Sequence, residues 1–466
     1  MTTPMTGLSE RIADFVISTT LEDIPDLARE RGARAVTDTI GVMAGGAASD
    51  LAAPLRVYLE ALGTTGTVPV LGTGMRTDAE HAALLNSAFG HALDFDDGYP
   101  YYPVHASTIV IGALIASLGD RPVSGKKFLE SYILGMEVVT CIGRGLGMGH
   151  YIKRGFHATG TLGMFGAVAA IAKLQGRDKE TLRRTLGIAA SMASGIQRNF
   201  GTMMKAMHSG MAARNGVTAS LLAASGVTGH MDVMEGKDNF FQAYGDENSS
   251  AEKAGDLLGN PYAFVAHGVG MKKFPCCNAC ARPIDGLLEL RRDHNLTPDN
   301  VAAIHCVLPP GGTNPLHYIK PKNANESAFS LEYCMAVALV DGAVGLDHFS
   351  EESIERADLL AALEKVTKEE HERCIAEDPD AKTRGPGPRG FVEVHVTTTD
   401  GKQYDNRVDI APGYPGRELT SPEMWAKFSD CTGYAGIDRD KARGVFDRLE
   451  TLETVADMRP LIDDLA

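Results

Sequence analysis

The sequence predicts a mainly α-helical protein, in which a smaller α+β lid domain is inserted into one large all-helical domain. Much of the first half places apolar or small residues at three- and four-residue spacing, with glycines at the ends, as packed helices do. Strand-like segments occur only later, and helical patterns return near the end. We therefore expect a helical domain of residues 1–265 and 406–466 and a lid domain of residues 266–405.

Particular segments carry this expectation. Helical spacing is clear at 24–46, 126–146 and 211–226, and again at 324–345 in the inserted part. The strand signals are VAAIHCVLPP, from Val301, and FVEVHVTTTDGKQYDNRVDI, in which the Asp-Gly pair after TTT predicts a hairpin turn. The segment MWAKFSDC then predicts a helix of the first domain.

Composition narrows the possible functions. The chain has 466 residues, of which 44% are apolar, and its formal net charge is −15. This charge disfavours nucleic acids and anionic membranes as partners, because both need a basic face. The start of the chain lacks a basic segment followed by an apolar one, and the longest apolar run is far shorter than the roughly 18 residues of a membrane span. We therefore expect a cytoplasmic protein, in which the eight cysteines are reduced thiols.

The stretch HALDFDDGYPYYPVHAS, residues 91–107, concentrates histidines, aspartates and tyrosines in an otherwise Ala- and Gly-rich chain. If the preceding helix continues to Asp97, then His91, Asp94 and Asp97 lie on one face. Asp96 then points about 200° away from Asp94. The three aspartates therefore do not converge on one ion, and we expect no metal site. A solvated helix end, with aspartates capping the next segment, is an alternative that the residues leave open.

Two further stretches offer catalytic candidates. GFHATG places His157 at a helix N-terminus, where the helix dipole disfavours its protonated form and favours a neutral base. The glycines at every third position of 160–166 predict close helix packing rather than a phosphate-binding loop. In KAMHSG, Lys205 and His208 lie one turn apart among small apolar residues, which favours an anion as the partner of the lysine.

The segment MKKFPCCNACARPID combines a lysine pair, Lys272 and Lys273, with three cysteines. Cys277 and Cys280 form a CxxC pair, which zinc and iron–sulfur sites use. A second cysteine or Cys/His pair does not stand at ligand spacing. We therefore expect buried thiols here.

Six motifs in order resemble the MmgE/PrpD family: HALDFDD with a later histidine, GFHATG, KAMHSG, KKFPCC, SAFSLEYCMAVALVDG and PGYPGRELTSPEMWAKF. The resemblance begins at 24–46 and covers nearly the whole chain. The family includes 2-methylcitrate dehydratase, cis-aconitate decarboxylase and iminodisuccinate epimerase. The resemblance implies a large helical domain with an α+β lid, a homodimer, a small anionic carboxylate as substrate, and neither a metal nor an organic cofactor.

The resemblance also implies a set of site residues, with the cleft expected at the domain boundary. The lysines would stabilise charge on a carbanion-like centre, the histidines would move protons, and Asp94 would orient a histidine. The implied catalytic residues are Asp94, His105, His157, Lys205 and Lys272, and the implied substrate-binding residues are Tyr318, His208, Lys273 and Arg282. Many family members have a histidine where this chain reads Ala281-Arg282, and this departure replaces a titratable group with a possible carboxylate clamp.

The expected function is a cofactor-independent lyase that dehydrates or decarboxylates a small di- or tricarboxylate. An epimerase of an iminodisuccinate-like dicarboxylate and a non-catalytic polycarboxylate-binding homologue are the alternatives. An aconitase-like iron–sulfur hydratase would use Cys277 and Cys280. DFDD also matches the acid motif of class II terpene cyclases, but one Trp and 6% aromatic residues are too few to line a carbocation cavity.

Overall fold

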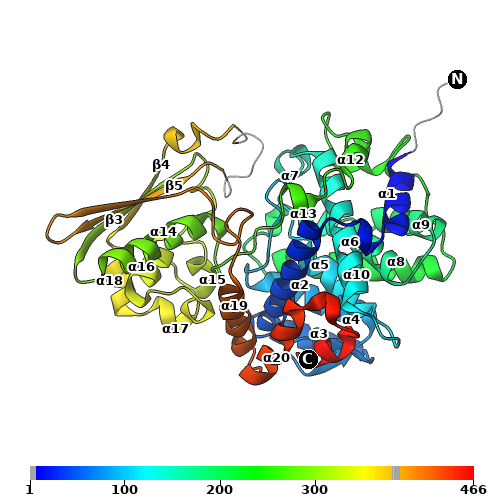
Figure 1. Ribbon diagram of the computed structural model, residues 1–466, viewed down its shortest axis with the longest axis horizontal. Helices are drawn as coiled ribbons and strands as arrows, with labels where there is room; N and C mark the ends of the chain where they lie inside the picture. The colour runs from blue at the N-terminus through cyan, green and yellow to red at the C-terminus, as the bar shows by residue number, and fades with distance from the viewer. Residues whose placement is uncertain (1–6, 380, 382–388) are drawn as a thin grey trace. The chain divides into compact units, whose positions relative to one another are not determined.

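The computed structural model describes residues 7–379, 381 and 389–466, and these residues are mostly helical (Figure 1). Helices account for 55% and strands for 8%, which confirms the mainly α fold class. The chain divides into two compact units, Met1–Val269 with Trp425–Ala466, and Gly270–Met424. That the second unit is a lid domain, and that its bounds are those predicted from the sequence, remain proposals.

The described residues of the first unit form helices and one short hairpin. The predicted helices at 24–46, 126–146 and 211–226 are confirmed as α2, α6 and α10. The α-helices that lie wholly in this unit are α1 (Leu8–Ser18), α2 (Asp26–Gly46), α3 (Ala52–Leu62), α4 (Ala79–Ala92), α5 (Ser107–Ala116), α6 (Gly125–Leu146), α7 (Gly149–Ile152), α8 (Ala158–Leu174), α9 (Lys179–Ala190), α10 (Met204–Ala224), α11 (Phe240–Tyr244), α12 (Ala251–Leu257), α13 (Ala263–Ala266), α20 (Arg439–Glu450) and α21 (Met458–Asp463). The hairpin pairs β1 (Val68–Val70) with β2 (Met75–Thr77).

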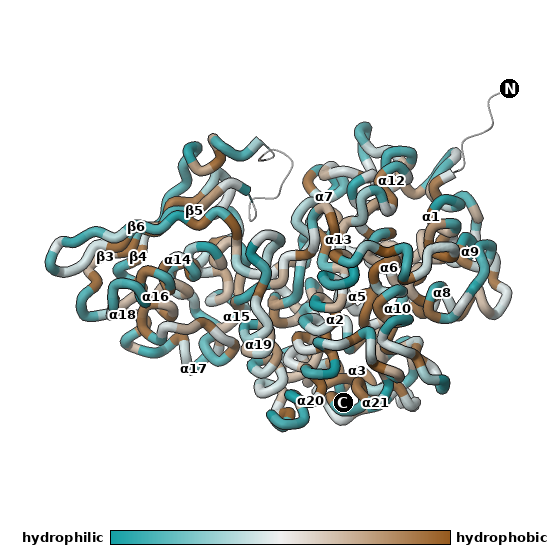
Figure 2. The backbone as a smooth tube through the Cα atoms, in the orientation of Figure 1, coloured by the Kyte–Doolittle hydropathy of each residue, from teal (hydrophilic) through white to brown (hydrophobic). Residues whose placement is uncertain are grey.

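Helices α5, α6, α8 and α10 pack around a core that carries the candidate site. Every residue of α5 is buried, and hydrophobic residues recur along α5 and α8 (Figure 2). The glycines of α8 let neighbouring helices approach closely. A Cβ at Gly163 would overlap Ile109, and one at Gly166 would overlap Val139. Close packing, predicted from the glycine spacing, is therefore confirmed.

The second unit is an α+β layer structure. Its sheet has the order β4-β3-β5-β6, formed by β3 (Val301–Leu308), β4 (Val366–Glu370), β5 (Val392–Thr398) and β6 (Gln403–Val408). β3 is parallel to β4 and antiparallel to β5, and β5 forms a hairpin with β6 around Gly401, whose φ is 83°. The Asp-Gly turn is therefore confirmed. The α-helices of this unit are α14 (Asn278–His294), α15 (Ala324–Ser327), α16 (Leu331–Asp341), α17 (Glu351–Ile354) and α18 (Ala357–Leu363).

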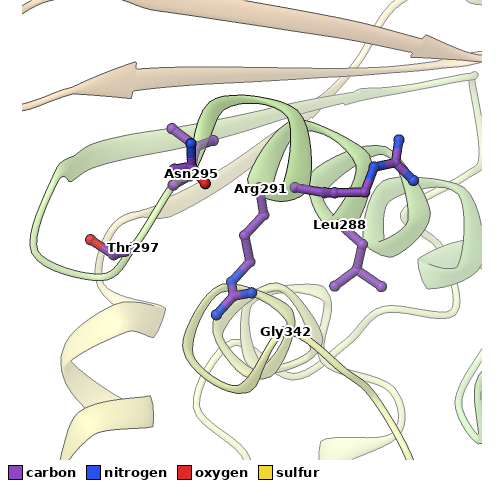
Figure 3. A pocket seen from close by; sticks show the side chains of 7 residues that line it. Leu288, Arg291, Asn295, Thr297 and Gly342 are labelled. Carbon is purple, nitrogen blue, oxygen red and sulfur yellow. The ribbon is translucent and has the colours of Figure 1, made fainter.

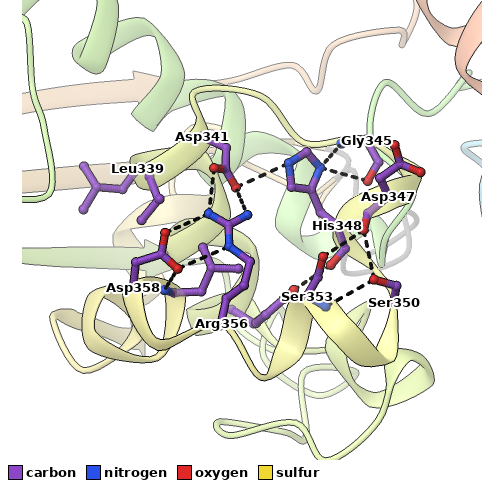
Figure 4. Close-up of polar contacts among 12 residues, drawn as sticks. Leu339, Asp341, Gly345, Asp347, His348, Ser350, Ser353, Arg356 and Asp358 are labelled. Atoms are coloured by element: carbon purple, nitrogen blue, oxygen red, sulfur yellow. Dashed lines mark hydrogen bonds and ion pairs between the residues drawn. The ribbon is translucent and has the colours of Figure 1, made fainter.

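A network of polar side chains fastens the end of α16 to the start of α18 (Figure 4). Arg356 donates Nη1–H to Asp341 Oδ2 and Nη2–H to Asp358 Oδ2, each at 2.8 Å. His348 Nε2 lies 3.4 Å from Asp341, and its Nδ1 accepts a hydrogen bond from the backbone N–H of Gly345. The network therefore stabilises the helical part of this unit.

An open pocket lies at the C-terminal end of α14 (Figure 3). Its lining includes Arg291, Asn295 and Gly342. The guanidinium of Arg291 donates to the carbonyl of Leu339 at 3.0 Å and thereby caps the end of α16. Arg291, one of the two arginines that line this pocket, is thus already used in helix capping.

α19 (Ser421–Tyr434) runs across the division between the units at Met424 and Trp425. Within the part of the chain that is described, no helix is both long and apolar enough to span a membrane. All eight cysteines are buried and none forms a disulfide, which agrees with the thiols expected from the sequence.

Candidate active site

The candidate site of the first unit begins where α4 ends. Asp78 caps the N-terminus of this helix, which stops at Ala92 instead of continuing to Asp97. Asp94 then adopts a left-handed backbone with φ 49° and turns the chain away from the helix axis. The expectation that His91, Asp94 and Asp97 share a helix face is therefore wrong.

Because of this turn, Asp96 folds back towards the helix. Its Oδ2 lies 2.8 Å from His91 Nδ1 and 3.5 Å from His105 Nδ1, and the side chains of His91 and Asp96 are completely buried. Burial lowers the pKa of His91 to about 4, outweighing the neighbouring carboxylate. Burial alone would raise the pKa of Asp96, but the two imidazoles hold that pKa well below its usual range. At neutral pH the pair is thus a carboxylate with a neutral imidazole.

His105 comes from the loop before α5 and folds back over Asp96. Its Nδ1–H donates to the backbone carbonyl of Asp97 at 2.6 Å, and its backbone N–H donates to Thr159 Oγ1 at 3.1 Å. The His105 side chain is 23% exposed, whereas that of His91 is fully buried. His105 is therefore fixed in orientation yet still open to solvent.

A second pair of histidines, His157 and His208, adjoins the first pair, His91 and His105. His157 is the N-cap of α8, as its position in GFHATG predicted, and its Nδ1 lies 3.0 Å from Nδ1 of His208 on α10. Burial lowers the pKa of His157 well below its usual value, with further lowering by neighbouring His91 and Lys205, and burial also lowers that of His208. His91 connects the pairs, since its ring centroid lies 4.8 Å from that of His105 and 5.8 Å from that of His157.

Lys205 adds a cation to this cluster. It lies in the first turn of α10, and its Nζ donates to Asp94 Oδ1 at 2.6 Å. Both side chains are about four-fifths buried, at 22% and 17% exposure. The sequence favoured an anion as the partner of Lys205, and in the structure this anion is Asp94. Asp94 was also expected to orient a histidine, but the carboxylate that lies 2.8 Å from His91 and 3.5 Å from His105 is that of Asp96.

Asp97 is a buried acid that was not among the site residues expected from the sequence. Its carboxylate accepts a hydrogen bond from Ser107 Oγ at 2.6 Å, and Ser107 Oγ lies 2.7 Å from the hydroxyl of Tyr132. Burial raises the pKa of Asp97 to about 8. Two adjacent aspartates thus differ in charge at neutral pH, because imidazoles lower the pKa of Asp96, whereas at Asp97 the effect of burial outweighs the hydrogen bond from Ser107.

Lys427 is another residue that sequence reasoning missed. Its Nζ donates to the carbonyl of Phe95 at 2.9 Å, lies 4.2 Å from the centroid of the Phe95 ring, and is 2.7 Å from Asp38 Oδ1. The lysine therefore holds the loop of Asp94, Asp96 and Asp97 from a segment more than 300 positions away. A lysine amid the apolar residues of MWAKF is the signal that could have drawn attention to it.

The other predicted site residues belong to the second unit. Lys272 is buried, and Tyr318 is 38% exposed. Lys273 is paired with acids, since its Nζ lies 2.9 Å from Glu423 Oε1 and 3.4 Å from Asp285 Oδ1. Their participation in a site with the histidines remains a prediction.

Arg282, the possible carboxylate clamp, is buried in the second unit. Its guanidinium donates to the backbone carbonyls of Gly390 at 2.6 Å, Arg389 at 3.0 Å and Asp409 at 3.4 Å. These bonds join α14 to the segments at either end of the β5–β6 hairpin. A role of Arg282 in binding a substrate carboxylate remains a prediction.

Two groups among the described residues could hold a metal ion, each with donor atoms within 4.8 Å of one another. One is His91, Asp96 and His105, in which both imidazole Nδ1 atoms already face oxygen acceptors. The other contains the sulfurs of Cys276, Cys280 and Cys334. Cys277, the other cysteine of the CxxC pair and the N-cap of α14, is not in this group.

Comparison with known proteins gives consistent matches over almost the whole chain. The cis-aconitate decarboxylase-like protein oryM of Aspergillus oryzae is 24% identical, covering 99% of this chain and 97% of its own. The cis-aconitate decarboxylase of Aspergillus terreus is 24% identical over 98% of this chain and 95% of its own. That of Mus musculus is 25% identical over 97% and 92%.

Family models give the assignment. The model of the MmgE/PrpD N-terminal domain matches residues 10–253, which include all the histidines of the cluster. The model of the MmgE/PrpD C-terminal domain matches residues 274–450. Together these matches cover most of the sequence, and the chain belongs to the MmgE/PrpD family.

Proposed function

We propose that this protein is a lyase that decarboxylates or dehydrates a small di- or tricarboxylate. The observation that carries the proposal is the cluster in the first unit, where four histidines, a buried carboxylate and a lysine–aspartate pair adjoin one another. The relatives named cis-aconitate decarboxylase support a polycarboxylate as the class of substrate.

The cluster supplies the two things that such a reaction requires. Loss of a carboxylate as CO₂ leaves an electron pair on carbon, and a nearby cation stabilises the resulting negative charge. Lys205 is that cation in the proposal, and a substrate carboxylate would take the place of Asp94 beside its Nζ. A histidine then delivers a proton to carbon or, in a dehydration, to the departing hydroxyl.

The proposal includes some components that rest on the family resemblance. Lys272 would add a second cation and Tyr318 would contact the substrate. The second unit would act as a lid, the protein would be a homodimer, and the reaction would need neither a metal nor an organic cofactor. Each of these can be tested separately from the chemistry of the histidine cluster.

Epimerisation of a dicarboxylate is a second candidate, favoured by the presence of two histidine pairs. An epimerase removes a proton from one face of a carbon and returns one to the other face, which requires two proton-carrying groups. The pairs His91–His105 and His157–His208 offer one group each. The two candidates differ in product, since only the lyase breaks a carbon–carbon or carbon–oxygen bond.

The test uses the full-length protein treated with a chelator and incubated with cis-aconitate, 2-methylcitrate, citrate and iminodisuccinate in deuterated water. Proton NMR should show a product that carries deuterium on carbon. Binding of these acids without turnover and without deuterium exchange would contradict both candidates and indicate a non-catalytic binding protein. Activity that disappears with the chelator and returns with a metal would contradict the cofactor-free part.

Variants identify the groups that act. His105→Gln and His157→Gln should each lower kcat by about 10²-fold, the usual contribution of a general acid or base, without altering folding. Lys205→Ala should both raise KM and lower kcat, because the cation serves binding and charge stabilisation. His230→Gln, at an exposed position of the same unit, is the matched control. Near-normal turnover of His157→Gln would remove His157 from the mechanism.

A further inference from the structure

Three thiols of the second unit converge where two of its helices begin. Cys276 stands two residues before α14, Cys280 is the third residue of that helix, and Cys334 is the fourth residue of α16. Their sulfur atoms all lie within 4.8 Å of one another, and none of the three residues is more than 1% exposed. α14 and α16 pack against each other (Figure 1). The fold therefore brings sulfurs from two distant parts of the sequence to one place.

Backbone hydrogen bonds hold the segments that carry these sulfurs. The N–H of Cys277 donates to the carbonyl of Ala328 at 2.8 Å, which ties the start of α14 to the residues before α16. The N–H of Cys334 donates to the carbonyl of Ser330, the N-cap of α16, at 3.1 Å. With the backbone held, each sulfur moves only by rotation about one side-chain torsion. Sulfurs bound to one ion at about 2.3 Å lie up to roughly 4 Å apart, a separation that such rotations can reach.

The donor atoms select the kind of ion. Among the residues that the structure describes, this group contains neither a carboxylate nor an imidazole. Magnesium and calcium ions need oxygen ligands and are therefore unsuited to it. Thiolate sulfur binds soft ions, and structural zinc takes four protein ligands rather than three. A soft ion that is satisfied by three sulfurs is the best match.

The surroundings restrict the charge of the complex. Cys276, Cys280 and Cys334 belong to one hydrophobic cluster, with Ile284 and Leu331 among its members. A net charge in such an interior is costly because water does not solvate it. Three thiolates around a monovalent or divalent ion leave a net negative charge, whereas three thiolates around a trivalent ion give a neutral complex. Burial therefore favours a trivalent ion.

We propose that Cys276, Cys280 and Cys334 form a binding site for a trivalent thiophilic ion of the kind that arsenite supplies. In each exchange a thiol gives its proton to one hydroxyl group of As(OH)₃, the As–O bond breaks, an As–S bond forms and water leaves. Three exchanges convert As(OH)₃ and three thiols into one As(S–Cys)₃ group and three water molecules, with no change of oxidation state. The inference goes beyond the proposed function, and no carboxylate substrate takes part in it.

The exchange gives up little and adds a cross-link. The thiol of Cys334 donates to the carbonyl of Ser327 at 3.8 Å, and thiols are weak donors, so losing this bond costs little. The bound ion joins the segment before α14 to α14 itself and to α16. It should therefore stabilise the second unit against unfolding, because it binds the folded arrangement of the three sulfurs. Burial makes entry slow, so binding should take place over a long incubation.

The test uses the full-length reduced protein and sodium arsenite, followed by gel filtration to remove the unbound ion. Native mass spectrometry should show the addition of one arsenic atom with the loss of three hydrogen atoms. X-ray absorption at the arsenic edge should show three sulfur neighbours and no oxygen. All eight cysteines are buried, so exposed thiols do not compete for arsenite. A complex with fewer than three sulfurs, or no complex after long incubation, would overturn the proposal.

Variants identify the ligands. Cys334→Ala should weaken arsenite binding by about a hundredfold or more, because removing a ligand costs at least as much as removing a group that orients one. Cys306→Ala is the matched control, since Cys306 is a fully buried thiol of β3 in the same unit and lies outside the group. Equal binding by Cys334→Ala and wild type, or equal loss in both variants, would refute the assignment.

Two further arms complete the experiment. If Cys334→Ala does not fold, Cys334→Ser, which keeps the size of the side chain, takes its place, and the number of sulfurs around arsenic in the wild type decides if neither folds. Zinc and cuprous ions are offered separately to the reduced protein. Retention of either ion by the three thiols, together with failure to retain arsenic, would overturn the trivalent assignment. None of these measurements depends on turnover of a polycarboxylate, so their outcome is independent of the proposed function.

Discussion

Replacing Asp97 with asparagine should change how stability depends on pH. The side chain is 1% exposed, and burial raises its pKa from 3.8 to about 8. Between these values the unfolded chain has lost the proton while the folded protein keeps it, so the folded state binds more protons. Stability contributed by this proton is therefore complete below about pH 4 and is lost as the pH rises through about 8.

The size of the effect follows from the shift. Between the two pKa values, each rise of one pH unit lowers the free energy of unfolding by about 1.4 kcal/mol. Through Asp97, a rise from pH 5 to pH 8 therefore lowers the free energy of unfolding by about 4 kcal/mol. Asparagine has no proton to lose, and its carbonyl can still accept the hydrogen bond from Ser107 Oγ. The free energy of unfolding of Asp97→Asn, relative to that of the wild type, should therefore rise by about 4 kcal/mol from pH 5 to pH 8.

Urea unfolding followed by the fluorescence of Trp425, the single tryptophan, measures this difference in the unit that contains Asp97. Wild type and Asp97→Asn would be compared at several pH values between about 5 and about 8. Asp50→Asn, at an exposed position, controls for the loss of one negative charge. A difference between wild type and Asp97→Asn that stays constant with pH would refute the claim that burial keeps Asp97 protonated.

Other consequences of the packing and the buried charges can be measured in the same way. Gly166→Ala, whose Cβ would overlap Val139, should destabilise the protein by about 1–3 kcal/mol. Gly444→Ala, on a helix with open space around it, should stabilise by about 0.5–1 kcal/mol, and equal effects in urea melts would contradict the packing of α8. Lys427→Met leaves Asp38 buried without its cation, so it should cost about 3–5 kcal/mol, and adding Asp38→Asn should recover part of this loss. Little recovery in the double variant would argue against the ion pair. All eight cysteines are buried, so a thiol-reactive disulfide should label them only slowly until urea is added; rapid labelling of the native protein would contradict their burial.

At the candidate site, the sequence pattern predicted the start of α8 but not the end of α4. His157 lies at the N-terminus of α8 as GFHATG predicted, because glycine, threonine and an apolar run mark a helix start. The end of α4 was missed. The residue that turns the chain is Asp94, which is not a glycine, and the apolar pattern continues through Phe95. The geometry of Asp94, Asp96 and Asp97 was therefore predicted incorrectly, although the stretch was correctly singled out.

The sequence by itself determined the mainly helical fold class, the helices α2, α6 and α10, the β5–β6 turn and the membership of the MmgE/PrpD family. The fold class, the helices and the turn are local or periodic features, since propensity, spacing and turn chemistry act over a few residues. The family membership rests instead on motifs that follow one another along nearly the whole chain. Only the tertiary structure decided that Asp96 faces two histidines, that Lys205 meets Asp94 and that Lys427 holds the loop. The contacts of Lys205 and Lys427 join residues distant in the sequence, and the contact of Asp96 with His91 depends on the left-handed turn at Asp94. The different charge states of Asp96 and Asp97 arise from burial and neighbours that no local pattern encodes.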